Sequence, residues 1–206
     1  MFANGSTYVG TGVLIDGENV LTNAHNLYNK DSVHVYPGYA KSLKAPFGVL
    51  KVICKLDSTV FMTDAYLAAP KTSAEDYAIL KVQGKEVYDR IYQHSDDRKI
   101  NFQQMDPPTE TLNISGYPCF KFWEFWRPRK CQYCYQNQTR KYTLTQNDVI
   151  MYRLNTRKGS SGSPLYIIED GRYYLIGIHK SGQGFSNQGV FYNEERYHTI
   201  QGWINQ

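Results

Sequence analysis

Short apolar runs separated by turn residues most constrain what this chain can fold into. Four such runs are clear, at residues 9–15, 49–52, 77–82 and 173–178, and clusters of Gly, Pro, Asn or Asp separate them. Runs of this length are typical of β-strands, because a helix normally needs ten or more residues. The sequence therefore predicts an all-β protein built from many short strands.

The chain is long enough to bury a substantial core. It has 206 residues, of which 41% are hydrophobic, and this size suits one compact unit or two small halves. One helix is expected at the C-terminal end, where Tyr197, Ile200, Trp203 and Ile204 share one face at helical spacing. No apolar stretch of the sequence has the length of a transmembrane span.

A segment rich in glycine and serine, Gly159-Ser160-Ser161-Gly162-Ser163-Pro164, has the pattern of a nucleophile loop. Two glycines around a serine allow a sharp turn whose backbone N–H groups can hold an oxyanion. The serine needs a base and a third group that orients the base. His25 and Asp76 lie upstream, each at the edge of an apolar run. We expect Ser161, His25 and Asp76 to form a catalytic triad, although each residue taken alone is more often an ordinary turn or hydrogen-bonded polar residue.

Five segments, taken in order, resemble those of chymotrypsin-fold serine proteases and are most similar to the glutamyl endopeptidases. They are Thr22-Asn23-Ala24-His25, Asp76-Tyr77-Ala78-Ile79-Leu80, Ser115-Gly116-Tyr117-Pro118, the serine segment with Gly177-Ile178-His179, and Asn187-Gln188-Gly189-Val190-Phe191. The resemblance implies two six-stranded antiparallel β-barrels, an active site in the cleft between them, and a C-terminal helix packed on the second barrel.

The resemblance also implies the domain organisation. Residues 1–206 would form a single trypsin-like serine protease domain, with the first barrel in residues 1–100 and the second barrel and terminal helix in residues 110–206. A polar run and a proline pair between residues 95 and 110 break the strand pattern and mark the crossover. The base and its orienting acid would then belong to one barrel and the nucleophile to the other.

By resemblance, the chain is a serine endopeptidase that hydrolyses polypeptides through an acyl-enzyme. The backbone N–H groups of Gly159 and Ser161 would form the oxyanion hole. Neither a metal nor an organic cofactor is needed. The same resemblance implies a secreted, extracellular and monomeric enzyme, although residues 1–10 lack the charged-then-apolar layout of a signal peptide.

The resemblance assigns the substrate pocket to six residues: Asn155, Thr156, His179, Ser181, Gly182 and Gly189. Asn155 stands where trypsins carry an aspartate, which disfavours cleavage after Lys or Arg. Thr156 and His179 match the pair that binds the substrate carboxylate in glutamyl endopeptidases. A hydroxyl and an imidazole can both donate to a carboxylate, and burying that acid favours a protonated imidazole. Cleavage after Glu or Asp is therefore expected; the alternative is that His179 is only a hydrogen-bonded strand histidine.

Ser181 and Gly182 would offer their backbone to an extended substrate, and Gly189 lies in the segment that forms one pocket wall.

Residues 120–142 interleave aromatic and basic side chains and have two interpretations. One is a surface for nucleic acid, a membrane or a partner. The other, which we favour, is a long hairpin whose aromatic side chains are partly buried. The net charge of +4 is too small to indicate nucleic-acid binding by itself.

Four cysteines, Cys54, Cys119, Cys131 and Cys134, leave three alternatives open. These are a disulfide within the cluster of the last three, free thiols, or a zinc site based on the Cys-x-x-Cys spacing.

Two other functional classes compete with the leading interpretation. A stress-type protease of the high-temperature-requirement family would share the His and Asp motifs and prefer aliphatic residues. That family usually has Gly-Gly-Pro in place of Gly162-Ser163-Pro164. A protease fold without activity would instead act as a binding module, with residues 120–142 as its interaction surface.

Overall fold

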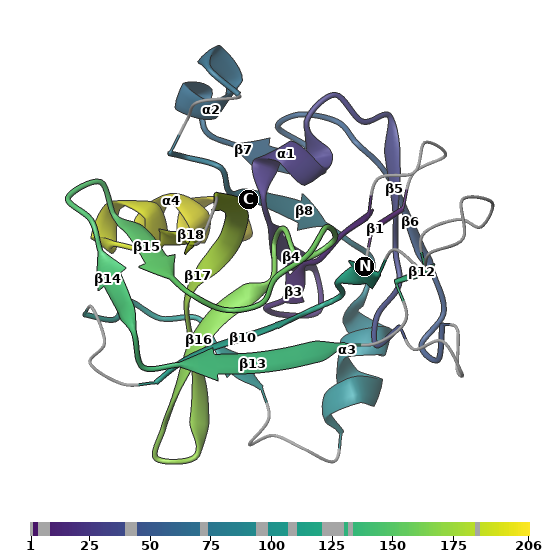
Figure 1. Ribbon diagram of the computed structural model, residues 1–206. Helices are drawn as coiled ribbons and strands as arrows, with labels where there is room; N and C mark the ends of the chain where they lie inside the picture. Colours follow the sequence, from purple (N-terminus) through teal and green to yellow (C-terminus); the bar gives the residue numbers. More distant parts are fainter. Residues whose placement is uncertain are drawn as a thin grey trace.

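The computed structural model describes residues 2–3, 9–39, 45–70, 74–93, 99–106, 111–120, 130–131, 134–183 and 186–206. Figure 1 shows its arrangement of short strands and four helices. The strands of the N-terminal half are β1 (Phe2–Ala3), β2 (Val9–Gly10), β3 (Val13–Leu14), β4 (Asn19–Thr22), β5 (Ser32–Val35), β6 (Leu50–Ile53), β7 (Val60–Met62) and β8 (Ala78–Lys81).

The strands of the C-terminal half are β9 (Ile100–Asn101), β10 (Leu112–Gly116), β11 (Cys119–Phe120), β12 (Lys130–Cys131), β13 (Tyr135–Thr139), β14 (Tyr142–Leu144), β15 (Val149–Tyr152), β16 (Pro164–Glu169), β17 (Arg172–Gln183) and β18 (Ser186–Phe191). The helices are α1 (Ala24–Leu27), α2 (Asp64–Ala68), α3 (Lys85–Tyr92) and α4 (Glu194–Ile204).

Two four-stranded sheets make up the N-terminal half, in the orders β2-β1-β5-β6 and β3-β4-β8-β7. β5 alternates between partly exposed and buried residues, with Val33 and Val35 inside. All four residues of β4 are buried, because the strand lies between other layers of the protein. These strands enclose an apolar cluster that includes Val20, Leu27 and Leu80.

One curled sheet dominates the C-terminal half, in the order β13-β10-β16-β17-β18-β15-β14, with β9 added parallel to β17. β17 is the longest strand, at 12 residues, and pairs with β16 and β18. Leu112, Ile150 and Leu165 belong to the core that this sheet encloses.

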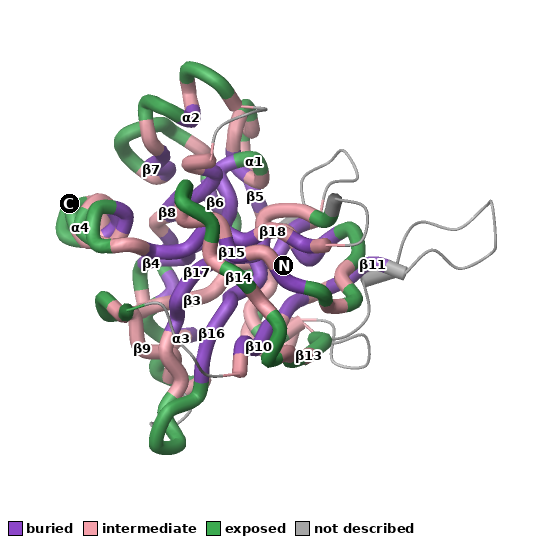
Figure 2. The backbone as a smooth tube through the Cα atoms, turned by 60° about the vertical axis from the view of Figure 1, so that its left-hand side comes forward, coloured by how far each residue is buried: buried purple, intermediate pink, exposed green. Residues whose placement is uncertain are grey.

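A third apolar cluster joins the two halves. It contains Leu21, Phe61, Tyr77 and Ile79 from the first half and Leu175, Ile178, Val190, Tyr192 and Ile200 from the second. Figure 2 shows buried backbone continuing through β4, β8 and β17. The halves therefore share a core and meet along a wide packed face.

The mostly-β architecture with a C-terminal helix confirms the predicted fold class. In α4, Ile200 is fully buried, and Trp203 and Ile204 pack against the shared core, as the helical spacing predicted. Helices α1, α2 and α3 were not predicted, because four to eight residues are too few to show a helical period. The predicted boundary between the barrels remains a prediction, since residues 94–98 and 107–110 lie outside the described residues. Across the described ranges, no helix is long and apolar enough to cross a membrane.

Candidate active site

His25 and Asp76 form a tightly held pair at the start of α1. The Nδ1 atom of His25 lies 2.7 Å from Oδ2 of Asp76, and the backbone N–H of His25 donates to Oδ1 at 3.0 Å. Asn23 donates from Nδ2 to the backbone carbonyl of Asp76 at 2.7 Å. Asp76 is 3% exposed, whereas the side chain of His25 is 38% exposed. A buried carboxylate that accepts from Nδ1 leaves Nε2 of the ring able to take a proton.

Two glycines in the left-handed region shape the serine loop between β15 and β16. Gly159 has φ +95° and Gly162 has φ +85°, a region that side chains with a Cβ rarely adopt. A Cβ atom on Gly162 would also lie 2.0 Å from the carbonyl oxygen of Thr11. A Cβ atom on Gly159 would lie 2.5 Å from the carbonyl oxygen of Tyr117. The loop therefore needs Gly162 to lie against the N-terminal half and Gly159 to lie against Tyr117.

The backbone of this loop leaves two N–H groups available. Those of Ser160, Gly162 and Ser163 donate to carbonyl groups. Within the part of the chain that the structure describes, the N–H groups of Gly159 and Ser161 have no acceptor. These are the two donors predicted for the oxyanion hole, and unpaired N–H groups in such a loop are suited to an anionic oxygen.

The hydroxyl of Ser161 does not bond to His25 in this arrangement. Its Oγ donates to the backbone carbonyl of Lys180 at 3.3 Å. The strand register shifts between His179 and Ser181, so Lys180 lies at an irregularity of β17. The structure thus brings His25 and Asp76 into direct contact, while the third member of the predicted triad has another partner.

Asn26 and Thr11, which the sequence analysis missed, connect the serine loop to the N-terminal half. Asn26 donates from Nδ2 to the carbonyl of Ser161 at 3.0 Å, and the Thr11 N–H donates to the same oxygen at 2.8 Å. The Thr11 hydroxyl donates to the Gly159 carbonyl at 2.7 Å and accepts from the Tyr117 N–H at 3.0 Å. Asn26 follows His25 directly and could have been noticed; nothing in the sequence marks Thr11.

Thr156 and Asn187 form one side of the predicted pocket. The Thr156 hydroxyl donates to Oδ1 of Asn187 at 2.5 Å, and Nδ2 of Asn187 donates to the Leu154 carbonyl at 2.6 Å. A Cβ atom on Gly182 would lie 3.8 Å from Oγ1 of Thr156, so this end of β17 borders the pair. Asn155 is exposed.

His179 lies on β17, where it pairs with Gly189 of β18. Ser181 pairs with Gln188 on the same strand. His179 is 3% exposed, and its Nδ1 lies 2.6 Å from the Tyr152 hydroxyl. Burial, with a smaller contribution from nearby His25, lowers the pKa of His179 from 6.5 to about 4.

Without substrate, the ring of His179 is therefore neutral at neutral pH, because it is buried and its partner Tyr152 is a phenol that carries no negative charge. The protonated imidazole expected beside a bound substrate carboxylate remains a prediction. Burial raises the pKa of Tyr152 well above its usual range, so the phenol keeps its proton. A phenol that donates to Nδ1 would fix the remaining proton of the ring on Nε2.

The cysteines do not form a four-cysteine zinc site. Cys119 is disulfide-bonded, whereas Cys54 and Cys134 are free thiols. The backbone of Cys119 pairs with that of Cys131 across β11 and β12. The side chain that is disulfide-bonded to Cys119 lies outside the described residues. Residues 121–129 and 132–133 lie outside the described residues, so both interpretations of residues 120–142 remain open.

Comparisons with known proteins agree with this fold. The family model described as a trypsin-like peptidase domain matches residues 10–178. A structure titled as a Glu endopeptidase in complex with MPD has a TM-score of 0.73 and 22% identity, covering 100% of this chain and 89% of that one. The protease Anisep from Arthrobacter nicotinovorans also has a TM-score of 0.73, at 16% identity, covering 98% of this chain and 92% of that one.

Among curated proteins, an extracellular metalloprotease of Bacillus subtilis (strain 168) is 24% identical over 212 residues, covering 98% of this chain and 60% of the relative. The chain thus spans about 60% of that relative's length. With the family model matching most of its residues, the chain belongs to the family of trypsin-like peptidase domains.

Proposed function

We propose that this protein is a serine endopeptidase that cleaves polypeptides after Glu, and less well after Asp, through an acyl-enzyme. The observation that carries the proposal is the pair of His25 and the buried Asp76 beside a serine loop with two unused N–H donors. This combination supplies a base, a group that orients it and a site for an oxyanion, which acyl transfer requires together.

In the proposed reaction, the Ser161 hydroxyl leaves its contact with the Lys180 carbonyl and transfers its proton to Nε2 of His25. Such contacts often become productive only when substrate binds. Oγ then forms a bond with the substrate carbonyl carbon, while Asp76 stabilises the imidazolium through Nδ1. The developing oxyanion accepts hydrogen bonds from the N–H groups of Gly159 and Ser161, each worth about 3 kcal/mol in the transition state.

The tetrahedral intermediate collapses when the carbon–nitrogen bond breaks and Nε2 donates its proton to the leaving amine. Water then attacks the acyl-enzyme, again losing a proton to His25, and Oγ of Ser161 leaves with that proton.

The proposed specificity uses the Nε2–H of the neutral His179 ring as a donor to the substrate carboxylate. The single proton of the Thr156 hydroxyl is donated to Asn187 in the structure, and it would turn to the carboxylate when substrate binds. Tyr152 and Asn187, paired across β15 and β18, support these two donors from behind. A carboxylate that enters beside the ring favours its protonated form and opposes the effect of burial. Binding of Glu would therefore be accompanied by proton uptake at His179.

The relatives support a location outside the cell. The curated relative is named an extracellular metalloprotease, and a structural neighbour is titled a Glu endopeptidase. We propose that this protein is likewise secreted and that its substrates are extracellular polypeptides.

A serine-directed fluorophosphonate and two matched peptide substrates test the proposal. We expect one covalent adduct per chain, located on Ser161 and absent from Ser161→Ala. With peptides that differ only by Glu or Gln before the cut, kcat/KM should favour Glu. His179→Gln should reduce that preference by about 100-fold, the value of a buried hydrogen bond to a charge.

Three outcomes would count against parts of this account. Labelling of Ser161 without a preference for Glu would support serine protease activity and contradict the assignment of Thr156 and His179 to a Glu-binding pocket. A preference for aliphatic residues would favour the stress-type specificity. Neither labelling nor cleavage would favour the binding module.

A further inference from the structure

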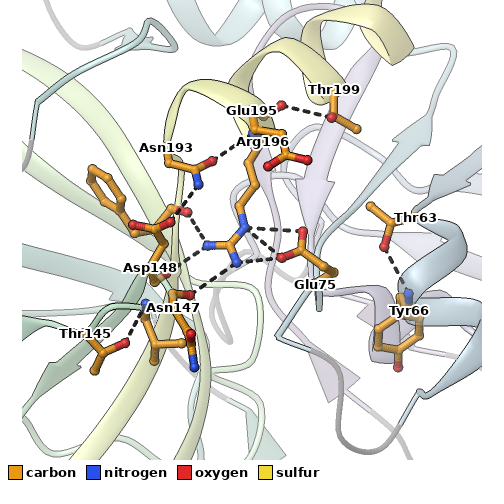
Figure 3. Close-up of polar contacts among 12 residues, drawn as sticks. Thr63, Tyr66, Glu75, Thr145, Asn147, Asp148, Asn193, Glu195, Arg196 and Thr199 are labelled. Atoms are coloured by element: carbon orange, nitrogen blue, oxygen red, sulfur yellow. Dashed lines mark hydrogen bonds and ion pairs between the residues drawn. The ribbon is translucent and has the colours of Figure 1, made fainter.

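The residue before Asp76 is held by an arginine from the other half of the molecule. Glu75 accepts from Arg196 of α4, with Nη2 to Oε1 at 2.6 Å and Nε to Oε1 and Oε2 at 3.1 and 3.3 Å. The two residues are 121 positions apart in the chain. Figure 3 shows the guanidinium lying between Glu75 and the segment that contains Asn147 and Asp148.

The guanidinium of Arg196 has an acceptor for each of its five N–H groups. Nη1 donates to the backbone carbonyls of Asp148 and Phe191, both at 2.8 Å, and Nη2 donates to that of Asn147 at 3.5 Å. The remaining N–H groups bond to Glu75. The Arg196 side chain is 7% exposed and that of Glu75 is 26% exposed. A buried guanidinium whose N–H groups are all hydrogen-bonded holds its partner carboxylate in a fixed position and also balances its charge.

The residue after Asp76 is also attached to the C-terminal helix. Tyr77 is 1% exposed and packs against Trp203 of α4 at a tilt, with ring centroids 5.6 Å apart. It also meets Tyr192 edge-on, with centroids 6.2 Å apart. Asp76 itself is held on the other side by Asn23. Asp76 is therefore positioned by contacts from both halves of the molecule. The ion pair between its neighbour Glu75 and Arg196 is the charged contact among them.

We infer that Arg196 is a positioning residue for Asp76: through Glu75, it fixes the aspartate against His25 across the two halves of the molecule. The inference rests on the proposed function for its effect on rate, but the geometry it concerns exists without substrate. Lysine at this position would keep the charge and lose the forked geometry, because its ammonium is a point donor. Even a small displacement of Asp76 would misalign His25, and misplacements of about 1 Å can cost about 100-fold in rate.

Arg196→Lys and Glu75→Gln are the test variants, and Asn193→Ala is the matched control. Asn193 caps the same helix by accepting from the Arg196 N–H at 2.9 Å and also donates to Asp148, but its side chain does not contact Glu75. We expect both test variants to lower kcat by about 10- to 100-fold per titrated active site, with KM and the Glu preference unchanged. The double variant should be no slower than the slower single variant. Asn193→Ala should lose thermal stability and keep its kcat.

A second readout does not depend on activity. The downfield proton NMR signal of the His25 Nδ1–H, assigned by its loss in His25→Ala, reports the hydrogen bond to Asp76. It should shift or broaden in Arg196→Lys and in Glu75→Gln and stay in place in Asn193→Ala. If the wild type cleaves nothing yet shows this pattern, the proposed function fails and the inference stands. An unchanged signal in both test variants, or an equal change in Asn193→Ala, overturns the inference and leaves Arg196 as an anchor of α4.

Discussion

Arg196 and His179 are almost equally buried, at 5% and 3% exposed, yet the protein treats their charges in opposite ways. Arg196 has an acceptor for every N–H group and a carboxylate opposite it, so its charge is compensated. The His179 ring bonds to Tyr152, a neutral phenol, and burial keeps the ring uncharged. A guanidinium keeps its proton in proteins, so a buried arginine needs acceptors, whereas burial can remove the proton from an imidazole.

This difference matches the two proposed tasks. A compensated charge is suited to hold a fixed geometry, because it gains nothing from further contacts. An uncharged imidazole in an apolar surrounding can instead respond to a charge that the substrate brings. In this account, Arg196 organises the reaction and His179 selects the substrate.

Removing the compensated charge should have the largest effect on stability. Arg196→Met leaves Glu75 without its cation and strands three backbone carbonyls, and we expect the free energy of unfolding to fall by about 4 kcal/mol. Urea denaturation measures it. The double variant Arg196→Met with Glu75→Met should recover part of the lost free energy of unfolding, because the Glu75 carboxylate that faced Arg196 is also removed. A single variant as stable as the wild type would contradict the comparison.

The neutral histidine predicts a pH dependence of stability. Between pH 6.5 and about 4, the unfolded chain binds a proton at His179 that the folded protein does not. Unfolding is therefore favoured as the pH falls through this window, and the stability that the neutral ring contributes is complete only above it. The loss should reach about 3 kcal/mol at the acid end.

Denaturation of the wild type and of His179→Gln across this pH range isolates the effect. The wild type should lose more stability on acidification than the variant does. Parallel curves would mean that His179 is protonated in the folded protein.

The smallest effect should follow from Tyr152→Phe, which leaves Nδ1 of His179 buried without a partner. We expect a loss of about 1.5 kcal/mol in stability and about a tenfold weaker preference for Glu over Gln. Tyr166→Phe is the control, because that hydroxyl is also buried and hydrogen-bonded but contacts Ser115 and Gln136 instead. If both variants weakened the preference equally, Tyr152 would have no special role.

The sequence allowed prediction of those parts of the site that depend on local patterns. These local patterns span only a few residues each: the glycines on either side of Ser161, the strand before His25 and the helical spacing around Ile200. The resemblance to a known family then predicted the fold in which they occur together. The mostly-β architecture and α4 followed from the same signals.

The remaining features depend on contacts between distant residues. Arg196 lies in a charged helical turn, where an arginine is normally exposed, and its partner is 121 residues away. Tyr152 and Asn187 become neighbours only through the register of β15 and β18. The ionisation of His179 depends on a degree of burial that its sequence neighbours do not reveal.

The most direct test of the central claim is digestion of a diverse peptide mixture by the wild type and by Ser161→Ala, with the cut sites read by mass spectrometry. The account predicts cuts concentrated after Glu, fewer after Asp, and none that survive in the variant. Cuts that persist in Ser161→Ala, or serine-dependent cuts with no excess after acidic residues, would contradict it.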